Sequence, residues 1–175
     1  MTGVPFAVTL FPGFFNGSGY GMKTRKKTIQ TPLPEHQGFI FFPHTADAKF
    51  QAYGATLEEA FRNAAYALVA LMWDREKIAP KIRHPVEFKA GDAERLLVDF
   101  LEEVLFLLDS RSFFLHAVEE LESRRRNGHY VLSGIFWGDA NGERYETHGE
   151  VKAITYNEML IERNRRFLVQ VVVDV

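Results

Sequence analysis

The 175-residue chain contains no cysteine, which excludes disulfide frameworks, thiolate zinc sites, iron–sulfur clusters and thiol nucleophiles. An excess of either charge is also missing: 21 basic and 23 acidic side chains give a formal net charge of −2, with no global footprint for nucleic acid. The sequence has no H-E-x-x-H pattern, no Gly-rich phosphate loop followed by Lys-Ser/Thr, and no nucleophile elbow. The sequence therefore contains none of the motifs that identify these enzyme classes.

Long hydrophobic runs are absent as well. Residues 1–15 are apolar, but they lack a basic region before the apolar stretch and are interrupted at Pro12 and Gly13. No segment approaches the ~20 consecutive apolar residues needed to cross a bilayer. We expect a soluble, cytoplasmic protein with no membrane partner.

The first 35 residues differ in composition from the rest. They contain a cluster of Gly, Ser and Asn followed by a short basic run. We interpret residues 1–35 as a flexible N-terminal extension and residues 36–175 as one domain. The alternative is an arm that contacts RNA through the basic run, which comprises Lys23, Arg25, Lys26 and Lys27.

Two helices are predicted by apolar residues that recur at helical spacing behind capping residues. Thr56 and Glu59 form a capping-box pattern ahead of a helix over residues 57–73, and Asp92 caps a second helix over residues 93–108. Each helix presents one apolar stripe, so each needs a sheet to cover.

The segments outside the two predicted helices are rich in β-branched and aromatic residues. Turn signals such as Asn127-Gly128 and Asn141-Gly142 divide them. Strands are expected over residues 39–42, 48–53, 82–88, 113–121, 130–137, 151–161 and 167–173. Because hairpin-linked strands leave one sheet face for helices, we predict an α+β two-layer sandwich. Its mixed, mostly antiparallel sheet is covered by the two helices.

Acidic residues occupy three unusual positions in this scheme. Asp47 closes a short connection between strands, Asp74 follows the C-terminal end of the first helix, and Asp174 ends a run of valines beside the carboxylate of Val175. Carboxylates and carbonyls are what calcium and magnesium prefer, so these groups are candidate ligands of a divalent cation. The alternative is that each Asp caps its own backbone or is solvated.

His44, His148 and Lys152 could carry further chemistry. His44 precedes Asp47 by three residues, while His148 and Lys152 flank the start of a strand. One interpretation is a metal-dependent hydrolase in which His44, Asp47 and His148 bind a metal that activates water. Another is that Lys152 contacts a phosphate or an acidic partner surface.

Five segments together resemble the archease family, in the family's own order from about Gly38 to the end of the chain. They are His44-Thr45-Ala46-Asp47, Gly54-Ala55-Thr56-Leu57-Glu58-Glu59-Ala60-Phe61, Leu96-Leu97-Val98-Asp99-Phe100-Leu101, Val151-Lys152-Ala153-Ile154-Thr155-Tyr156 and Val171-Val172-Val173-Asp174-Val175.

The resemblance implies a non-catalytic accessory protein that activates an RtcB-type RNA ligase in tRNA splicing or RNA repair. Such proteins are understood to help the ligase react with GTP, form its guanylated histidine and turn over repeatedly. The resemblance also implies a divalent cation, calcium or alternatively magnesium, on Asp47, Asp174 and Val175, with Asp74 the less distinctive match. Lys152 falls in a motif associated with the ligase. No stable direct binding of nucleic acid is expected.

Two departures from the family pattern stand out. The family commonly has a histidine after the Thr-Tyr pair, where this chain has Asn157, which cannot titrate near neutral pH. The segment between Trp137 and His148 is also short for the family. A general protein-binding or chaperone module is a further alternative that sequence does not separate from an activator of one ligase.

Overall fold

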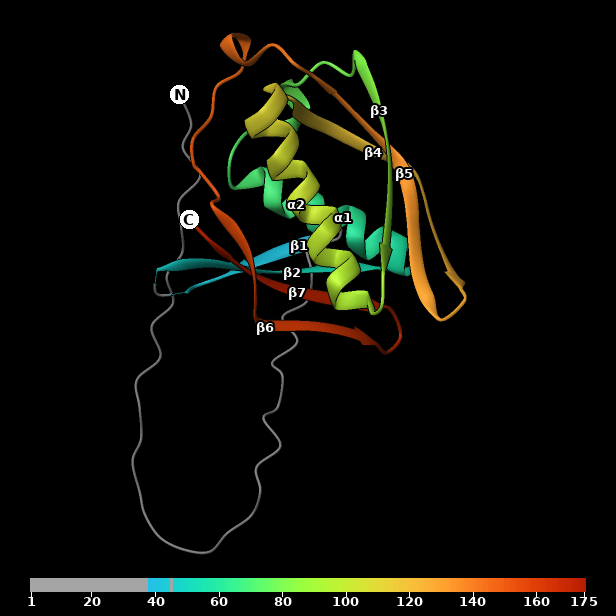
Figure 1. Cartoon of the computed structure of the whole chain (residues 1–175). Helices are drawn as coiled ribbons and strands as arrows, with labels where there is room; N and C mark the ends of the chain where they lie inside the picture. Colours follow the sequence, from blue (N-terminus) through green and yellow to red (C-terminus); the bar gives the residue numbers. More distant parts are fainter. Residues whose placement is uncertain (1–37, 45) are drawn as a thin grey trace, which may run out of the picture. The chain divides into compact units, whose positions relative to one another are not determined.

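The computed structural model describes residues 38–44 and 46–175. The predicted extension over residues 1–35, its basic run and Thr45 lie outside the described residues. The described part of the chain forms seven strands, two α-helices and two short 3-10 helices (Figure 1). In chain order these are β1 (Phe39–Phe42), β2 (Asp47–Gly54), α1 (Leu57–Ala70), η1 (Arg75–Lys77), β3 (Ile82–Ala90), α2 (Ala93–Arg111), β4 (Phe114–Arg126), β5 (His129–Asp139), η2 (Gly142–Arg144), β6 (Ala153–Arg163) and β7 (Phe167–Asp174).

The strands form two antiparallel sheets, in the orders β1-β2-β7-β6 and β3-β5-β4. Helix α1 packs on β2 and β7 of the first sheet and on β4 of the second, while α2 packs on β6 and β3. The helices therefore lie between the sheets (Figure 1). The predicted α+β sandwich of mostly antiparallel strands and two helices is confirmed. The prediction of a single sheet is not: β5 and β6 do not pair, and the strands form two separate sheets.

Both helices begin at the predicted caps. Thr56 Oγ1 accepts a hydrogen bond from the Glu59 amide at 3.1 Å, and Asp92 Oδ1 accepts one from the Arg95 amide at 2.7 Å. These bonds satisfy amides that have no partner within the helix. Helix α1 ends at Ala70 rather than at Trp73, because the amides of Leu71 and Met72 bond to carbonyls three residues back and so tighten the turn.

The core contains aromatic side chains from both helices and both sheets. Phe61 of α1 and Phe100 of α2 are fully buried with ring centroids 6.0 Å apart, and Phe100 meets Phe136 of β5 edge to face at 5.5 Å. Trp73 is also buried and packs edge to face against Phe114 at 5.1 Å. Such aromatic contacts add to the gain from burial and fix the helices against the second sheet.

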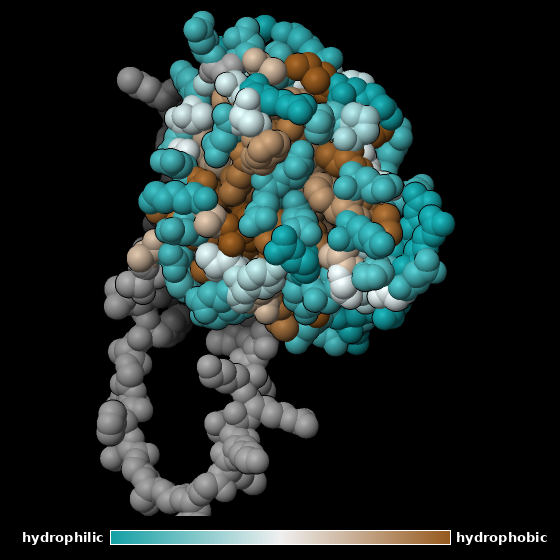
Figure 2. Space-filling view, in the orientation of Figure 1, coloured by the Kyte–Doolittle hydropathy of each residue, from teal (hydrophilic) through white to brown (hydrophobic). Residues whose placement is uncertain are grey.

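The face of the molecule seen in Figure 1 is largely hydrophilic, with apolar residues broken into small patches (Figure 2). Within residues 38–44 and 46–175, neither helix is both long enough and apolar enough to cross a membrane.

Candidate functional site

Asp47 and Asp174 meet at one edge of the four-stranded sheet. Asp47 is the first residue of β2 and Asp174 the last of β7, and the two are direct cross-strand partners. Ala153, at the start of β6, faces Asp174 from the other side. Directly opposed side chains lie on the same face of a sheet, so two like charges are held near each other at a cost to stability. A cation at this edge would offset that cost.

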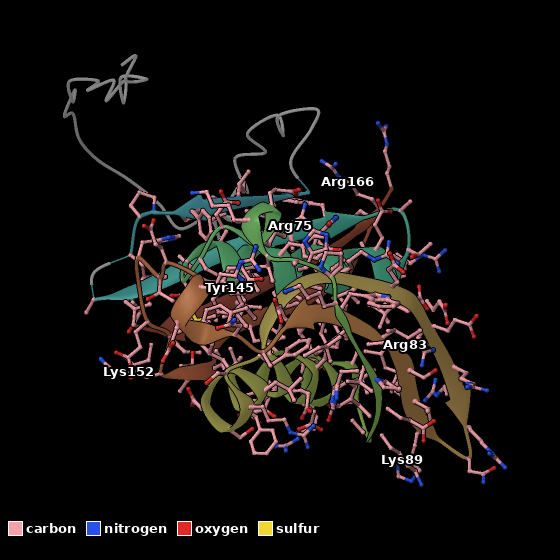
Figure 3. All side chains as sticks on the ribbon, turned by 90° about the horizontal axis from the view of Figure 1, so that it is seen from above. Arg75, Arg83, Lys89, Tyr145, Lys152 and Arg166 are labelled. Carbon is pink, nitrogen blue, oxygen red and sulfur yellow. The ribbon has the colours of Figure 1, made fainter. Side chains whose placement is uncertain are left out.

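Lys152 is attached to the same edge. Its amide donates to the carbonyl of Asp174 at 2.8 Å, and its Nζ donates to the main-chain oxygen of Val175 at 3.0 Å. Both contacts fix Lys152 beside the end of β7, although the side chain remains exposed. Figure 3 shows Lys152 on the opposite side of the molecule from Arg83 and Lys89.

His44 connects Asp47 to a residue that sequence analysis did not identify. Its Nδ1 lies 3.5 Å from Asp47 Oδ2, and its Nε2 lies 3.8 Å from Glu158 Oε1. Glu158 also forms a close ion pair with Lys49 of β2. The hydrogen bond and charge of Lys49 hold the pKa of Glu158 below its ordinary value, with burial opposing the shift.

Glu158 reaches this position through an irregularity in β6. The register with β7 shifts between Thr155 and Leu160, and Glu158 has a positive φ of 51°. Its carbonyl accepts a bond from Gln170 Nε2 at 2.8 Å, which holds the bulge against β7. Bulges of this kind redirect side chains, and no local sequence signal marks this one.

Asp74 and His148 form a second group at the end of α1. Trp73 and Thr147 are bridge partners, and the His148 amide donates to Met72 at 2.9 Å. His148 Nε2 lies 3.1 Å from the carbonyl of Ala70, a helix end with no basic residue in its own last turn. The interaction places an imidazole N–H donor at the negative end of the helix dipole.

The carboxylate of Asp74 already has partners in this arrangement. It caps η1 by accepting a bond from the Glu76 amide at 3.1 Å, and it lies 3.7 Å from Lys77 Nζ. These contacts match the alternative interpretation of Asp74 as a residue that caps its own backbone. They leave Asp47, Asp174 and Val175 as the predicted ligands that share one edge.

Two hollows flank Asp74 and His148, with volumes of about 500 and 420 Å³. The first is bounded by Phe39, Asn63, Tyr66 and Arg75, and the second by Lys77, Arg144 and Tyr145. Arg75 stacks over the Tyr66 ring at 4.2 Å and also pairs with Glu76. The second hollow is bounded on one side by the β5–β6 connection, which therefore shapes it.

That connection is anchored by a buried carboxylate that the sequence analysis missed. Asp139 Oδ2 accepts a bond from the Tyr145 hydroxyl at 2.7 Å and from Lys81 Nζ at 2.9 Å. These two donors, Tyr145 first, hold the pKa of Asp139 below its ordinary value. Further along, a Cβ on Gly149 would lie 2.3 Å from the carbonyl oxygen of Leu71, so only glycine allows this close approach.

The donor set at the β2 and β7 edge fits a hard divalent cation in its chemistry. Two carboxylates and the main-chain oxygen of Val175 are oxygen donors of the type that calcium and magnesium take. Within residues 38–44 and 46–175, however, no three His, Asp or Glu side chains converge closely enough to hold one ion. The predicted hydrolase set is accordingly divided: His44 contacts Asp47, whereas His148 contacts the end of α1.

Comparison with known proteins agrees with this fold. A model of the archease protein family matches residues 39–175. The archease of Methanosarcina mazei is 40% identical over 145 residues, covering 78% of this chain and 95% of the relative. The archease of Pyrococcus furiosus is 38% identical over 137 residues, covering 77% and 96%.

Two solved structures share the architecture. Protein 1598 of Methanobacterium thermoautotrophicum superposes with a TM-score of 0.69 at 33% identity, covering 79% of this chain and 99% of that one. A Thermotoga maritima archease, described as a possible chaperone, gives a TM-score of 0.50 at 17% identity, covering 77% and 94%, and supports the fold alone.

The fold and the shared sheet edge thus define an α+β sandwich whose candidate site residues Asp47, Asp174 and Lys152 lie where strands end. The extent and identity of the matches make the assignment specific: the chain belongs to the archease family.

Proposed function

We propose that this chain is a non-catalytic accessory protein that activates an RtcB-type RNA ligase by promoting its guanylation with GTP and its repeated turnover. The observation that carries the proposal is the cross-strand pair Asp47 and Asp174 with Lys152 beside it. All three residues lie in the segments by which the chain resembles the family. Membership of that family, with relatives matched over nearly their full length, supports the same role.

In the proposed role, Asp47 and Asp174, joined by the main-chain oxygen of Val175 once Lys152 Nζ releases it, would hold a divalent cation, calcium in the first instance. A bound cation would neutralise the paired carboxylates and so stabilise the edge formed by β2 and β7. Asp74 would contribute only after releasing the Glu76 amide and Lys77.

Lys152 and His44 would then act toward the partner. Lys152 is exposed and carries a compact positive charge, which suits a contact to a phosphate or to a carboxylate of the ligase. His44 is held between Asp47 and Glu158, so its ring orientation follows from the state of that edge. The catalytic histidine that receives the guanylate belongs to the ligase.

Reconstitution with the cognate ligase tests this proposal. Guanylation of the ligase and joining of RNA ends over several turnovers are measured with and without the full-length protein, which is also tested alone with RNA and GTP. We expect strong stimulation of both ligase readouts and no joining, cleavage or GTP hydrolysis by this chain alone. A ligase of verified activity that is not stimulated would contradict the proposal, and hydrolysis by this chain alone would favour the hydrolase interpretation.

A further inference from the structure

Two hairpins lie at the end of the fold opposite the Asp47 edge. Gly54, the last residue of β2, pairs with Phe167, so the β6–β7 hairpin lies beside the start of α1. The amide of Ser123 donates to Glu58 in the first turn of α1 at 3.1 Å, which brings the β4–β5 hairpin to the same end. Figure 1 shows both hairpins on the right of the view and the C-terminus on the left.

These hairpins concentrate positive charge that the whole chain does not show. Residues 122–129 and 162–167 contain six arginines and two glutamates, a formal charge of +4 in a chain of net −2. All six arginines are exposed: Arg124, Arg125, Arg126, Arg163, Arg165 and Arg166. Positive and negative charges nearly balance over the whole sequence, but positive charge is concentrated at these two hairpins.

Aromatic rings orient three of these guanidinium groups, but no carboxylate forms an ion pair with any of the six among the described residues. None of the ion pairs found among residues 38–44 and 46–175 includes these arginines. Three of them stack on aromatic rings instead: Arg125 over Tyr130 at 5.3 Å, Arg163 over Phe167 at 5.3 Å and Arg166 over Tyr53 at 4.7 Å. Stacking uses the face of a guanidinium and leaves its N–H edges available.

Two carboxylates at the start of α1, those of Glu58 and Glu59, are already engaged. Glu58 accepts bonds from Ser123, and Glu59 accepts one from the Ala55 amide at 2.6 Å. Both belong to the first turn of α1, where acidic side chains also satisfy the positive helix end. They are therefore committed to the helix start and the adjoining strand.

We propose that the two arginine hairpins bind the phosphodiester backbone of RNA, which revises the expectation from the sequence that the chain does not bind nucleic acid stably. Planar guanidinium groups match phosphate oxygens in a bidentate geometry, and their preorganisation on rings lowers the entropy lost on binding. The surface lies at the far end of β2 from Asp47, about 23 Å away at ~3.3 Å per residue. One end of the protein can then hold RNA while the Asp47, Asp174 and Lys152 edge remains open to a protein partner.

Fluorescence anisotropy of a labelled single-stranded RNA, titrated with the full-length protein between about 50 and 300 mM KCl, tests this surface. Neutralising a phosphate contact removes about 0.7 from the slope of log affinity against log salt for single strands. We expect R124Q/R125Q/R126Q and R163Q/R165Q/R166Q each to lower that slope by about 1 to 2 and to weaken binding roughly tenfold at low salt.

The matched control is R83Q/R111Q/R144Q, which removes three exposed positive charges outside the hairpins. It should change RNA affinity by less than about twofold, since it alters net charge without removing a contact. Equal weakening by the control, or no binding by the wild type at low salt, would overturn the proposal. Melting temperatures near that of the wild type verify that each variant is folded.

Two further measurements distinguish RNA binding by the hairpins from binding to an acidic protein and from activation of the ligase. A labelled polyglutamate peptide of the same length should bind more weakly than the RNA; tighter binding would assign the hairpins to an acidic protein surface and overturn the RNA assignment. Both hairpin variants should still stimulate guanylation of the ligase. If the wild type fails to stimulate the ligase but binds RNA through the hairpins, the proposed function falls and this inference stands.

Discussion

Asp47 and Asp174 face each other directly across β2 and β7, although they are 127 positions apart along the chain. The contact places two carboxylates on one face of a sheet edge, and Lys152 joins the same edge through the carbonyl of Asp174. Like charges at directly opposed positions destabilise a strand pair. A bound cation would relieve this repulsion, and the first prediction tests it.

The effect of Asp174→Asn on the free energy of unfolding should depend in sign on whether a divalent cation is present. Without divalent ions, Asp174→Asn should raise the free energy of unfolding by ~0.2 to 1 kcal/mol, because it removes the repulsion with Asp47. With excess calcium, the wild type should gain stability and the variant should not, since a ligand stabilises only the state that binds it. Denaturant unfolding in chelator and in calcium measures both effects. Glu162→Gln on β6 is the control. A loss of stability in Asp174→Asn in chelator would contradict the proposed repulsion between Asp47 and Asp174.

Lys152→Ala should weaken stimulation of ligase guanylation severalfold while leaving folding near wild type and without lowering cation affinity, because it frees the Val175 oxygen. Its Nζ makes one exposed hydrogen bond to Val175, a contact worth no more than about 0.5 to 1.5 kcal/mol. Guanylation rates, calorimetric titration with calcium and melting curves separate these quantities. Lys89→Ala serves as the matched control, because Lys89 is exposed on β3. Equal stimulation by both variants would leave Lys152 with no role toward the ligase.

Two phenylalanines on α2 provide a test of the core. Phe100 is fully buried and contacts the rings of Phe61 and Phe136, whereas Phe106 is 57% exposed. Phe100→Ala should cost ~3 to 5 kcal/mol in the free energy of unfolding, the usual range for a buried aromatic. Phe106→Ala should cost less than about 1 kcal/mol. Urea unfolding of both variants measures the difference, and similar costs would mean that α2 packs through another face.

Asp139 should make stability depend on pH in the acid range. Its pKa is lowered in the folded state, so its contribution is complete well above the ordinary value of about 3.9 and is lost as pH falls through the folded pKa. Asp139→Asn should therefore be less stable than wild type at neutral pH, and the gap should narrow below about pH 5. Unfolding measured from neutral to acid pH tests this, with Glu87→Gln as an exposed control. A gap that stays constant with pH would show that the charge of Asp139 is not the cause.

Local features of the fold could be predicted because local chemistry determines them. Thr56 and Asp92 mark helix starts through bonds to amides three residues ahead. Asn127 and Gly128 adopt the positive φ values of 51° and 80° that a tight two-residue hairpin requires. The division into two sheets was not predictable in this way, because it depends on which distant strands pair.

The candidate site shows the same limit. Asp47, Asp174 and Lys152 could be named from their motifs, but the register that makes the two carboxylates direct partners is a long-range property. Glu158 enters through a bulge that no residue pattern announces, and Asp139 gains Lys81 from 58 positions away. Charged residues whose partners lie far along the chain resemble ordinary surface residues in sequence.

The β5–β6 connection is anchored to the rest of the domain at its C-terminal end. After η2, the chain rejoins the body through the Trp73 and Thr147 bridge, the His148 amide and the close approach of Gly149 to Leu71. Residues added or removed before Thr147 are thus absorbed upstream of a fixed point. We therefore expect insertions or deletions before Thr147 to leave Lys152 at the same edge. Such changes should alter the wall of the neighbouring hollow, which Arg144 and Tyr145 help to form, without moving Lys152.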